Sequence, residues 1–154
     1  MANEDELWAL VVGGREGILA TIGSSGRPQL SNILYLVDHP TRMVRISTTA
    51  DRVKARNLAR DPRASLHVGG DDFWHFAVAE GSVTLSETAS DPDDEAVTEL
   101  RAVHGAFYAE LPDARTFAEE MIAARRLVIR LQVDHLYGIM ATGGLRPRAD
   151  DEQA

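Results

Sequence analysis

A cluster of basic residues in the middle of the chain is the strongest candidate for a binding site. Five bases fall within residues 52–63, and three consecutive hydroxyl side chains come just before them, at residues 47–49. Hydroxyls, cations and the backbone N–H groups at the start of a helix together suit a phosphate group. The spacing therefore predicts a phosphate pocket, with a solvated basic helix as the competing interpretation. The residues concerned are Ser47, Thr48, Thr49, Arg52, Lys54, Arg56, Arg60 and Arg63.

Lys54 stands apart from the other bases, because fifteen of the sixteen basic residues are arginine. A bias toward arginine is typical of a GC-rich genome, which explains the many arginines but not the one lysine. Asp51 stands where the N-cap of a helix over residues 51–60 is expected, and the bases crowd the first turn of that helix. The helix dipole disfavours cations there unless an anion lies nearby. Both details favour the phosphate pocket.

A second candidate is the strand that follows a glycine-rich turn at residues 23–27. Alternation along a strand places successive side chains on opposite faces. Backbone amides beside polar side chains could hydrogen-bond the edge of a planar heterocycle, and a half-exposed barrel strand without a ligand is the alternative. One face of this strand holds Gln29, Ser31 and Tyr35, and the other holds Leu30, Asn32 and Leu34.

An aromatic run at residues 72–76 is the third candidate. Trp74 could stack beside a ring system, whereas the alternative is that Phe73 and Phe76 fill the mouth of a barrel or a subunit contact. No serine–histidine–aspartate order and no paired carboxylates can be recognised from spacing, so we predict no catalytic side chain. We also predict no role for three further histidines, which are His67, His104 and His135.

The composition excludes several classes of function. The chain has 154 residues, of which 44% are hydrophobic, and this suits one domain, placed at residues 1–145, with a polar tail at 146–154. The net charge of −8 repels nucleic acid and anionic membranes. With no cysteine and five dispersed histidines, neither a thiolate nucleophile nor a metal motif is expected. No signal peptide and no apolar stretch of about 18 residues is recognised, so we expect a cytoplasmic protein without a membrane partner.

The hydrophobic patterning predicts a mainly β (α+β) domain. Alternating apolar residues indicate six to seven short antiparallel strands in meander order, with short flanking helices. This pattern favours a closed or nearly closed barrel, because a βαβ nucleotide fold needs long helices between its strands. Strands are expected at 17–22, 28–38, 43–48, 64–68, 73–80, 81–85 and 127–137; helices are expected at 3–12, at 51–60 and, in an acidic segment broken near Pro112, twice within 87–120.

The motifs in this order resemble the pyridoxamine 5′-phosphate oxidase-like split β-barrel flavoproteins. More narrowly, they are similar to the actinobacterial branch of that family, which uses the deazaflavin coenzyme F420. The resemblance covers most of the chain, and its specificity comes from the order and spacing of motifs that are individually modest. The motifs are Gly26-x-Pro28-x-x-Ser31-Asn32-x-x-Tyr35, Ser47-x4-Arg52-x-Lys54-x-x-Asn57-Leu58, Asp61-Pro62-Arg63-Ala64, Val78-Ala79-Glu80-Gly81 and the strand at 126–138.

The resemblance implies a homodimer with two cofactor sites at the subunit interface, each lined by both chains. It implies three groups of cofactor-binding residues. Arg52 and Lys54 would hold the cofactor phosphate with Ser47, Thr48 and Thr49, while Asn57 would hold the neighbouring backbone or linker. Pro28, Gln29, Leu30, Ser31 and Asn32 would line the ring and the ribityl chain, and Trp74 with His75 would approach from the other subunit.

The implied activity is that of an F420-dependent oxidoreductase, which transfers hydride from the reduced deazaflavin to an electron-poor small molecule. An FMN-dependent oxidase or reductase on the same barrel is one alternative, a non-catalytic cofactor carrier is another, and a nucleic-acid module using residues 52–63 is a third. The reaction's proton could come from solvent, His75 or Tyr35. Arg56, Arg60 and Arg63 could meet the oligoglutamate tail of F420, and the acidic segment 87–120 is expected to border the substrate side.

Overall fold

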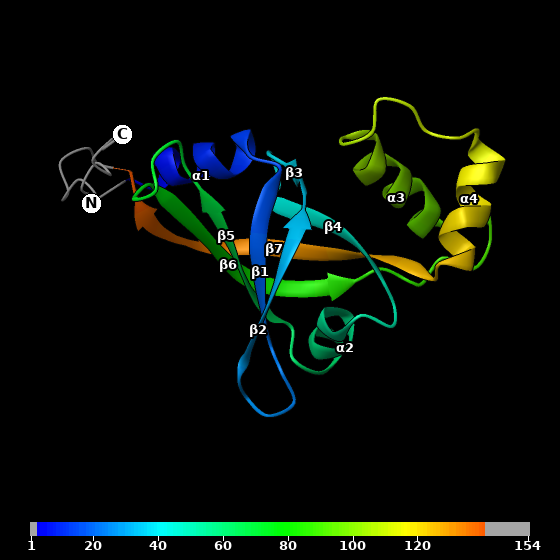
Figure 1. Cartoon of the computed structure of the whole chain (residues 1–154), viewed down its shortest axis with the longest axis horizontal. Helices are drawn as coiled ribbons and strands as arrows, with labels where there is room; N and C mark the ends of the chain where they lie inside the picture. Colours follow the sequence, from blue (N-terminus) through cyan, green and yellow to red (C-terminus); the bar gives the residue numbers. More distant parts are fainter. Residues whose placement is uncertain (1–2, 141–154) are drawn as a thin grey trace, which may run out of the picture.

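The computed structural model describes residues 3–140, which form one antiparallel sheet and four helices (Figure 1). The strands are β1 (Glu16–Ile22), β2 (Pro28–Leu34), β3 (Leu36–Asp38), β4 (Met43–Thr49), β5 (Arg63–Gly69), β6 (Phe76–Leu85) and β7 (Arg126–Ile139). The helices are α1 (Glu4–Gly13), α2 (Val53–Arg60), α3 (Glu95–Gly105) and α4 (Ala114–Ala123). The polar tail expected at 146–154 lies outside the described residues. None of the helices described is long and apolar enough to cross a membrane.

The strands of the described part follow the order β2-β1-β5-β6-β7-β4-β3, and all neighbours are antiparallel. The sheet curls so that β2, at one end of this order, contacts β4 near the other end (Figure 1). The product is a half-barrel that hydrogen bonds do not close between β2 and β4. This architecture confirms the predicted mainly β split barrel.

Alternation along the strands fills the inside of the half-barrel. Leu66 on β5, Ile46 on β4 and Leu131 on β7 are all fully buried in one core. Helix α1 adds Trp8 to this core; the side chain of Asn3 caps the helix by accepting a 2.8 Å hydrogen bond from a backbone N–H of the first turn. Each such buried apolar side chain contributes roughly 1.5–3 kcal/mol. The core thereby fixes β4 and β2, the two strands that carry most of the predicted site.

Strand β6 replaces two expected strands with one. The prediction separated 73–80 from 81–85, but the structure has a single strand whose pairing with β7 shifts by one residue between Glu80 and Gly81. A side chain at position 81 would collide with the backbone oxygen of Gln132. Glycine is therefore the residue that lets β6 continue through this bulge.

The stretch expected as one strand at 28–38 is broken at Tyr35. The backbone N–H of Tyr35 donates to the carbonyl of Arg15 outside the regular ladder, at 2.9 Å, and the buried phenol donates to the carbonyl of Val11 at 2.7 Å. These two hydrogen bonds turn the chain from β2 into the short strand β3. A pattern of apolar residues alone does not reveal this turn.

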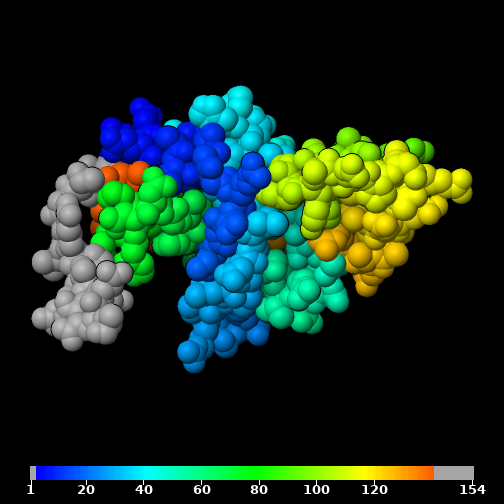
Figure 2. Space-filling model, turned by 45° about the horizontal axis from the view of Figure 1, so that its top comes forward, coloured from blue at the N-terminus to red at the C-terminus, as the bar shows by residue number. Residues whose placement is uncertain are grey.

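Helices α3 and α4 form a hairpin that projects from one side of the barrel (Figure 2). The predicted break near Pro112 is confirmed: Asp113 caps α4 by accepting from the N–H of Thr116 at 2.9 Å. A small second core joins the hairpin to β7, with Leu100 and Phe117 packed around Val128. The hairpin is thus attached beside β4 and β7, next to the predicted phosphate-binding residues.

Candidate functional site

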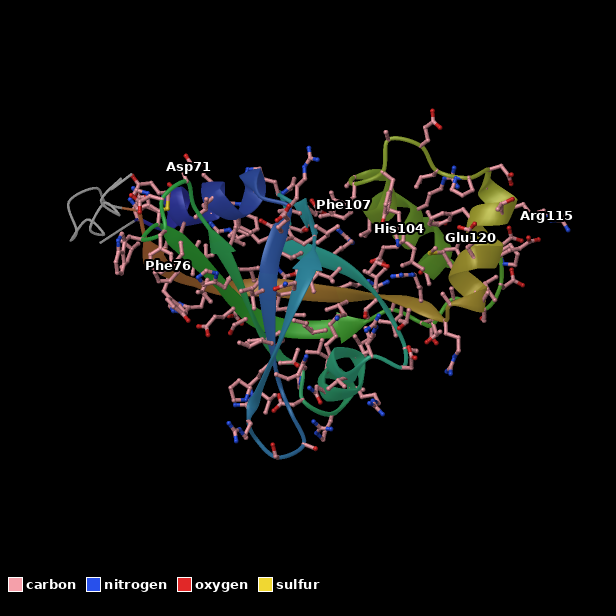
Figure 3. The ribbon with its side chains drawn as sticks, in the orientation of Figure 1. Asp71, Phe76, His104, Phe107, Arg115 and Glu120 are labelled. Carbon is pink, nitrogen blue, oxygen red and sulfur yellow. The ribbon has the colours of Figure 1, made fainter. Side chains whose placement is uncertain are left out.

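A cleft of about 180 Å³ opens between the sheet and α3, with α2 beside it. Polar and charged side chains enter it from five elements: Asn32 from β2, Ser47 from β4, Lys54 from α2, His104 from α3 and Arg126 from β7. Figure 3 shows His104 on α3 and Phe107 in the turn that follows this helix. The remaining lining consists of Ile33, Leu34, Val103, Phe107 and Tyr108.

The polar end of the cleft carries uncompensated positive charge. Lys54 and Arg126 are both half-buried, and within residues 3–140 neither forms an ion pair with a carboxylate. Burial lowers the pKa of Lys54, and the neighbouring positive charge of Arg52 lowers it further. A half-buried cation without a counter-charge is unfavourable, so this end of the cleft suits an anion.

Ser47 lies between two basic side chains in the cleft. Arg126 Nη1 donates to Ser47 Oγ at 3.1 Å, and Ser47 Oγ lies 2.9 Å from His104 Nε2. A guanidinium only donates, so the serine oxygen accepts from Arg126. In the contact with His104 the serine donates to Nε2 when the imidazole proton is on Nδ1, and accepts when that proton is on Nε2. Burial and then the charge of Arg126 lower the pKa of His104, so the imidazole is neutral near pH 7.

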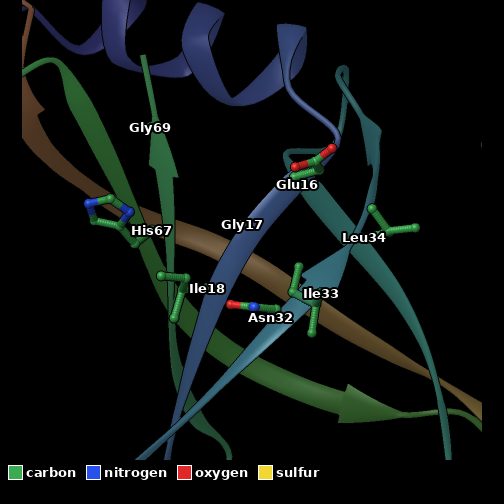
Figure 4. A pocket seen from close by; sticks show the side chains of 8 residues that line it. All are labelled: Glu16, Gly17, Ile18, Asn32, Ile33, Leu34, His67 and Gly69. Atoms are coloured by element: carbon green, nitrogen blue, oxygen red, sulfur yellow. The ribbon is translucent and has the colours of Figure 1, made fainter. Parts of the chain in front are cut away.

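A second groove, of about 510 Å³, continues from the cleft across β2, β1 and β5 (Figure 4). Both hollows are lined by Asn32, Ile33 and Leu34, so together they form one continuous surface. The further lining includes Ile18 of β1, and His67 of β5, whose ring stacks on Phe76 at a centroid distance of 5.3 Å. The surface thus runs from a cationic end to a flatter, mixed apolar and polar face.

The structure divides the β2 residues predicted to line a ring between the two faces of the sheet. Leu30 and Asn32 point outward and are exposed, and Asn32 lines both hollows. Gln29 points inward and accepts a hydrogen bond from Thr21 Oγ1 at 2.9 Å. Ser31 also points inward, where its buried Oγ has no partner among the described residues. Pro28 begins the strand at an exposed position.

The three predicted hydroxyls also separate, because strand β4 alternates. Ser47 lines the cleft, whereas Thr48 points to the opposite face and is buried. Thr49 donates its hydroxyl to Asp51 at 2.5 Å. The expectation that Asp51 caps α2 is therefore wrong: the N-cap position is Arg52, with no side-chain cap. Hydrogen bonding to Thr49 is the main cause of the lowered pKa of Asp51.

Of the predicted basic cluster, only Lys54 lines the cleft. Arg52 and Arg56 are exposed. Arg60 donates to the carbonyl of Ile22 at 3.1 Å, and Arg63 pairs with Asp61 at 2.8 Å. The last two arginines thus serve contacts within the chain.

Asn57 is buried away from the cleft. Its Nδ2 donates to Thr21 Oγ1 at 3.1 Å, and its Oδ1 accepts from Arg60 at 3.1 Å. Because Thr21 in turn donates to Gln29, these bonds link α2 to β1 and β2. In this structure the observed contacts of Asn57 therefore position α2, the helix that presents Lys54.

Trp74 and His75 lie in the turn between β5 and β6. Asp71 and Phe76, which flank this turn, lie at the end of the sheet away from His104 (Figure 3). Trp74 is exposed, and Phe73 is 83% exposed, so Phe73 does not fill a barrel mouth. Neither Trp74 nor His75 lines the cleft or the groove of its own chain, and the resemblance implies that they approach the site of a second copy.

Tyr35 is removed from the candidate proton donors. Its side chain is only 1% exposed and its hydroxyl is donated to Val11, and burial raises its pKa. The phenol neither lines the cleft nor releases a proton readily. Of the three proton sources considered from the sequence, solvent and His75 remain.

Sequence reasoning missed His104 and Arg126. They lie 57 and 79 residues from Ser47 along the chain, so no local motif joins them. The helical spacing of Leu100, Val103 and His104 was the available signal, because it places the histidine at the border of the apolar face of α3. That signal shows which side of α3 faces the protein, but not that the cleft lies there.

Comparison with solved structures supports the observed architecture. A conserved hypothetical protein from Mycobacterium tuberculosis, Rv2991, is 25% identical, with a TM-score of 0.67 and 94% of each chain covered. An F420 reductase is 21% identical, with a TM-score of 0.60, covering 84% of this chain and 94% of that one. A FAD-binding protein from Mesorhizobium loti is 15% identical, with a TM-score of 0.62, covering 88% and 90% of the two chains.

The family comparison covers nearly all of the described fold. The family described as Pyridoxamine 5'-phosphate oxidase matches residues 4–140, from the start of α1 to just beyond the end of β7. The match therefore includes the half-barrel, α2 and the helical hairpin that borders the cleft. Together with the split-barrel architecture, it places the chain in the pyridoxamine 5'-phosphate oxidase family.

Proposed function

We propose that this protein is an F420-dependent oxidoreductase that reduces an electron-poor small molecule. When bound, the deazaflavin would supply the hydride. The observation that carries the proposal is the pair of cations, Lys54 and Arg126, that face one cleft without a carboxylate partner among residues 3–140. A cofactor with a phosphate linker would provide the missing negative charge.

The residues present fit such a cofactor along the continuous surface. Lys54, Arg126 and Ser47 would hold the phosphate at the cationic end. Lysine suits this role because its ammonium reaches a phosphate as a flexible point charge. On the groove side of β2, the side-chain amide of Asn32 could hydrogen-bond the ring or the ribityl chain. The side chain of Ile18 could pack against a planar ring. The chain would thus bind, orient and partly shield the cofactor without an acid–base side chain of its own.

We infer a preference for F420 over FMN because F420 carries further anionic groups beyond its phosphate. Arg56 is exposed on α2, two residues from Lys54 in sequence, and no carboxylate pairs with it within the described range. It could therefore meet the acidic tail that F420 has and FMN lacks. Arg60 and Arg63 are engaged within the chain and are less suited to that contact.

A second copy of the chain belongs to the proposal. Exposed apolar side chains lie on the outward face of β1 and β2, with Ile18 at 39% and Leu34 at 44% exposure. These side chains line the same surface as the ring site. We propose that this face pairs two copies and that Trp74 and His75 of each copy complete the other's site.

Paired titrations with F420 and FMN test the cofactor assignment, with tryptophan fluorescence as the signal. We expect tighter binding of F420 and quenching that is mostly lost in Trp74→Phe, because the second tryptophan, Trp8, is buried in the core. Tighter binding of FMN would contradict the F420 assignment and favour the FMN-dependent alternative.

Turnover separates an enzyme from a carrier. Reduced F420 is mixed with the protein and a panel of enones, quinones and tetrapyrroles, and its reoxidation is followed by absorbance. Reoxidation that depends on both protein and substrate is the expected result. Tight binding of F420 without reoxidation by any member of the panel would instead favour a non-catalytic carrier.

A further inference from the structure

We propose that His104 is a positioning residue that couples binding of an anion in the cleft to the uptake of one proton, acting through the hydroxyl of Ser47. His104 Nε2 lies 2.9 Å from Ser47 Oγ, and both side chains line the cleft with Lys54. The inference rests on the proposed function only in identifying the anion with the phosphate linker of the cofactor.

The hydroxyl of Ser47 has a single proton, and its direction depends on the charge of His104. In the free protein Arg126 donates to the serine oxygen at 3.1 Å, and the proposal assigns neutral His104 the tautomer with its proton on Nδ1, in which Nε2 accepts the serine proton. If His104 takes up a proton, Nε2 becomes a donor to the second lone pair of Ser47 Oγ. The serine proton is then released from His104 and can be donated to an anion in the cleft.

The surroundings of His104 keep it neutral until an anion arrives. From β7 it faces the charge of Arg126, and from α2 Lys54 enters the same cleft. It also meets two rings, Phe117 of α4 at 5.5 Å and Tyr108 in the loop after α3 at 5.9 Å between centroids. Within residues 3–140 no carboxylate pairs with it. A protonated imidazole here would be a third cation beside two others.

An anion seated near Lys54 and Arg126 reverses this balance. Its negative charge favours the protonated imidazole, and the imidazole in turn adds positive charge to the site and frees the serine proton for the anion. One proton comes from solvent, and no covalent bond other than N–H is formed. Because the complex then holds more protons than the free protein, affinity must rise as pH falls through the region where His104 titrates.

The affinity for F420 as a function of pH tests the coupling. Any titration of F420 itself is common to the wild type and to His104→Gln, so the ratio of their affinities reports the proton taken up at His104. We expect the wild type to gain affinity over His104→Gln toward low pH, by up to about tenfold for each pKa unit by which the ligand raises the pKa of His104. At high pH the two proteins should bind F420 with similar affinity. A ratio of affinities that does not change with pH would overturn the inference.

His135→Gln provides the matched control, since His135 is exposed on β7 and lines neither hollow. This variant should keep the wild-type slope. If it lost the slope as His104→Gln does, the pH dependence would not belong to the cleft and the inference would fail.

A second measurement needs neither His104→Gln nor the cofactor. The ring of His104 is titrated by NMR with and without sulfate, which stays a dianion over this range. We expect sulfate to raise the pKa of His104, and to raise it less in Ser47→Ala. An unchanged pKa at saturating sulfate would overturn the inference.

The two measurements distinguish failure of the inference from failure of the proposed function. If F420 binds to the wild type and to His104→Gln with the same pH dependence, the function stands and the role of His104 falls. If neither F420 nor FMN binds but sulfate raises the pKa of His104, the coupling stands and the cofactor assignment falls.

Discussion

Lys54 places a single ammonium at the point where α2 meets the cleft. Its side chain is half-buried, and its charge has no carboxylate partner among the described residues. Burial lowers its pKa without an ion pair to compensate. A residue held in this way stabilises the folded protein little, and its arrangement suits a bound anion instead.

Replacing this one charge tests the binding site. We expect Lys54→Ala to weaken F420 binding more than tenfold, which corresponds to about 1.4 kcal/mol or more, because a charge-assisted contact to phosphate is lost. Fluorescence titration measures the affinity, and circular dichroism checks that the fold is intact.

Arg115→Ala is the control for net charge, because Arg115 is exposed on α4 and pairs only with Glu119 there. This variant removes the same charge from a place away from the cleft and should bind F420 with wild-type affinity. Equal affinities for Lys54→Ala and the wild type would contradict the assignment of Lys54 to the phosphate.

At the scale of single residues, the sequence predicts which neighbouring residues share a site better than which distant residues do. Ser47 and Lys54 could be predicted together because seven residues separate them and a hydroxyl next to a basic helix suits phosphate. His104 was predicted to have no role, since its contact with Ser47 depends on how the hairpin docks on the sheet. Tyr35 was considered a proton donor because the pattern does not show that its hydroxyl is already donated to Val11.

At the scale of elements, one carboxylate fastens the helical hairpin to the barrel. Glu99 on α3 accepts hydrogen bonds from Arg130 Nε at 2.7 and 2.9 Å and from Arg130 Nη2 at 2.7 Å, and a further one from Arg45 at 3.2 Å. Burial alone would raise the pKa of Glu99, but the bonds from Arg130 and Arg45 outweigh it and the pKa is lowered. Through this contact α3 is held where it forms one wall of the cleft.

Glu99→Gln should loosen this attachment in a pH-dependent way. Removing one partner of a partly buried ion pair is expected to lower the free energy of unfolding by about 1–3 kcal/mol at pH 7. Because the folded pKa lies below the unfolded one, the stabilisation is complete above the unfolded value near pH 4.3. It is lost as pH falls through the lower folded pKa, so the two proteins should converge in stability at acid pH. Urea unfolding over this pH range measures the difference.

Glu119→Gln removes an exposed carboxylate from the same hairpin and is the matched control. Its i,i+4 pair with Arg115 lies at the surface, and we expect a change within about 0.5 kcal/mol. If Glu99→Gln cost no more than this control at pH 7, the hairpin would be held by its apolar core and not by Glu99.

The elements themselves were largely predictable, since alternation and helical spacing report directly which side chains face the core. The strand at residues 126–139 is the clearest example, because Leu127, Ile129, Leu131 and Val133 are all buried in turn. The errors fall where tertiary contacts decide. Gly81 continues a strand through a bulge instead of ending it, and Asp51 binds Thr49 instead of capping a helix.

At the scale of the whole molecule, the outward face of β1 and β2 is the proposed contact between two copies. We expect Ile18→Glu to weaken self-association by about 2–5 kcal/mol, because the contact would bury an unpaired carboxylate. Sedimentation velocity over a range of protein concentrations measures this change, and F420 affinity should fall in parallel as Trp74 and His75 of the second copy leave the site.

Val12→Glu is the control for a new charge on a similarly exposed apolar position, because Val12 is 38% exposed on α1 and lies outside the groove. It should leave the sedimentation coefficient unchanged. An Ile18→Glu variant that sediments like the wild type at every concentration would exclude this face as the contact.

The two edges of the sheet bear on what kind of assembly is possible. One edge is β3, which spans only Leu36–Asp38, and the other is β2, whose first residue is Pro28 and has no N–H to donate. Short or proline-bearing edges are poor templates for adding a foreign strand. Growth by edge-to-edge pairing, which would extend one copy after another into a fibre, is therefore disfavoured, and copies that meet through their faces can stop at a closed pair.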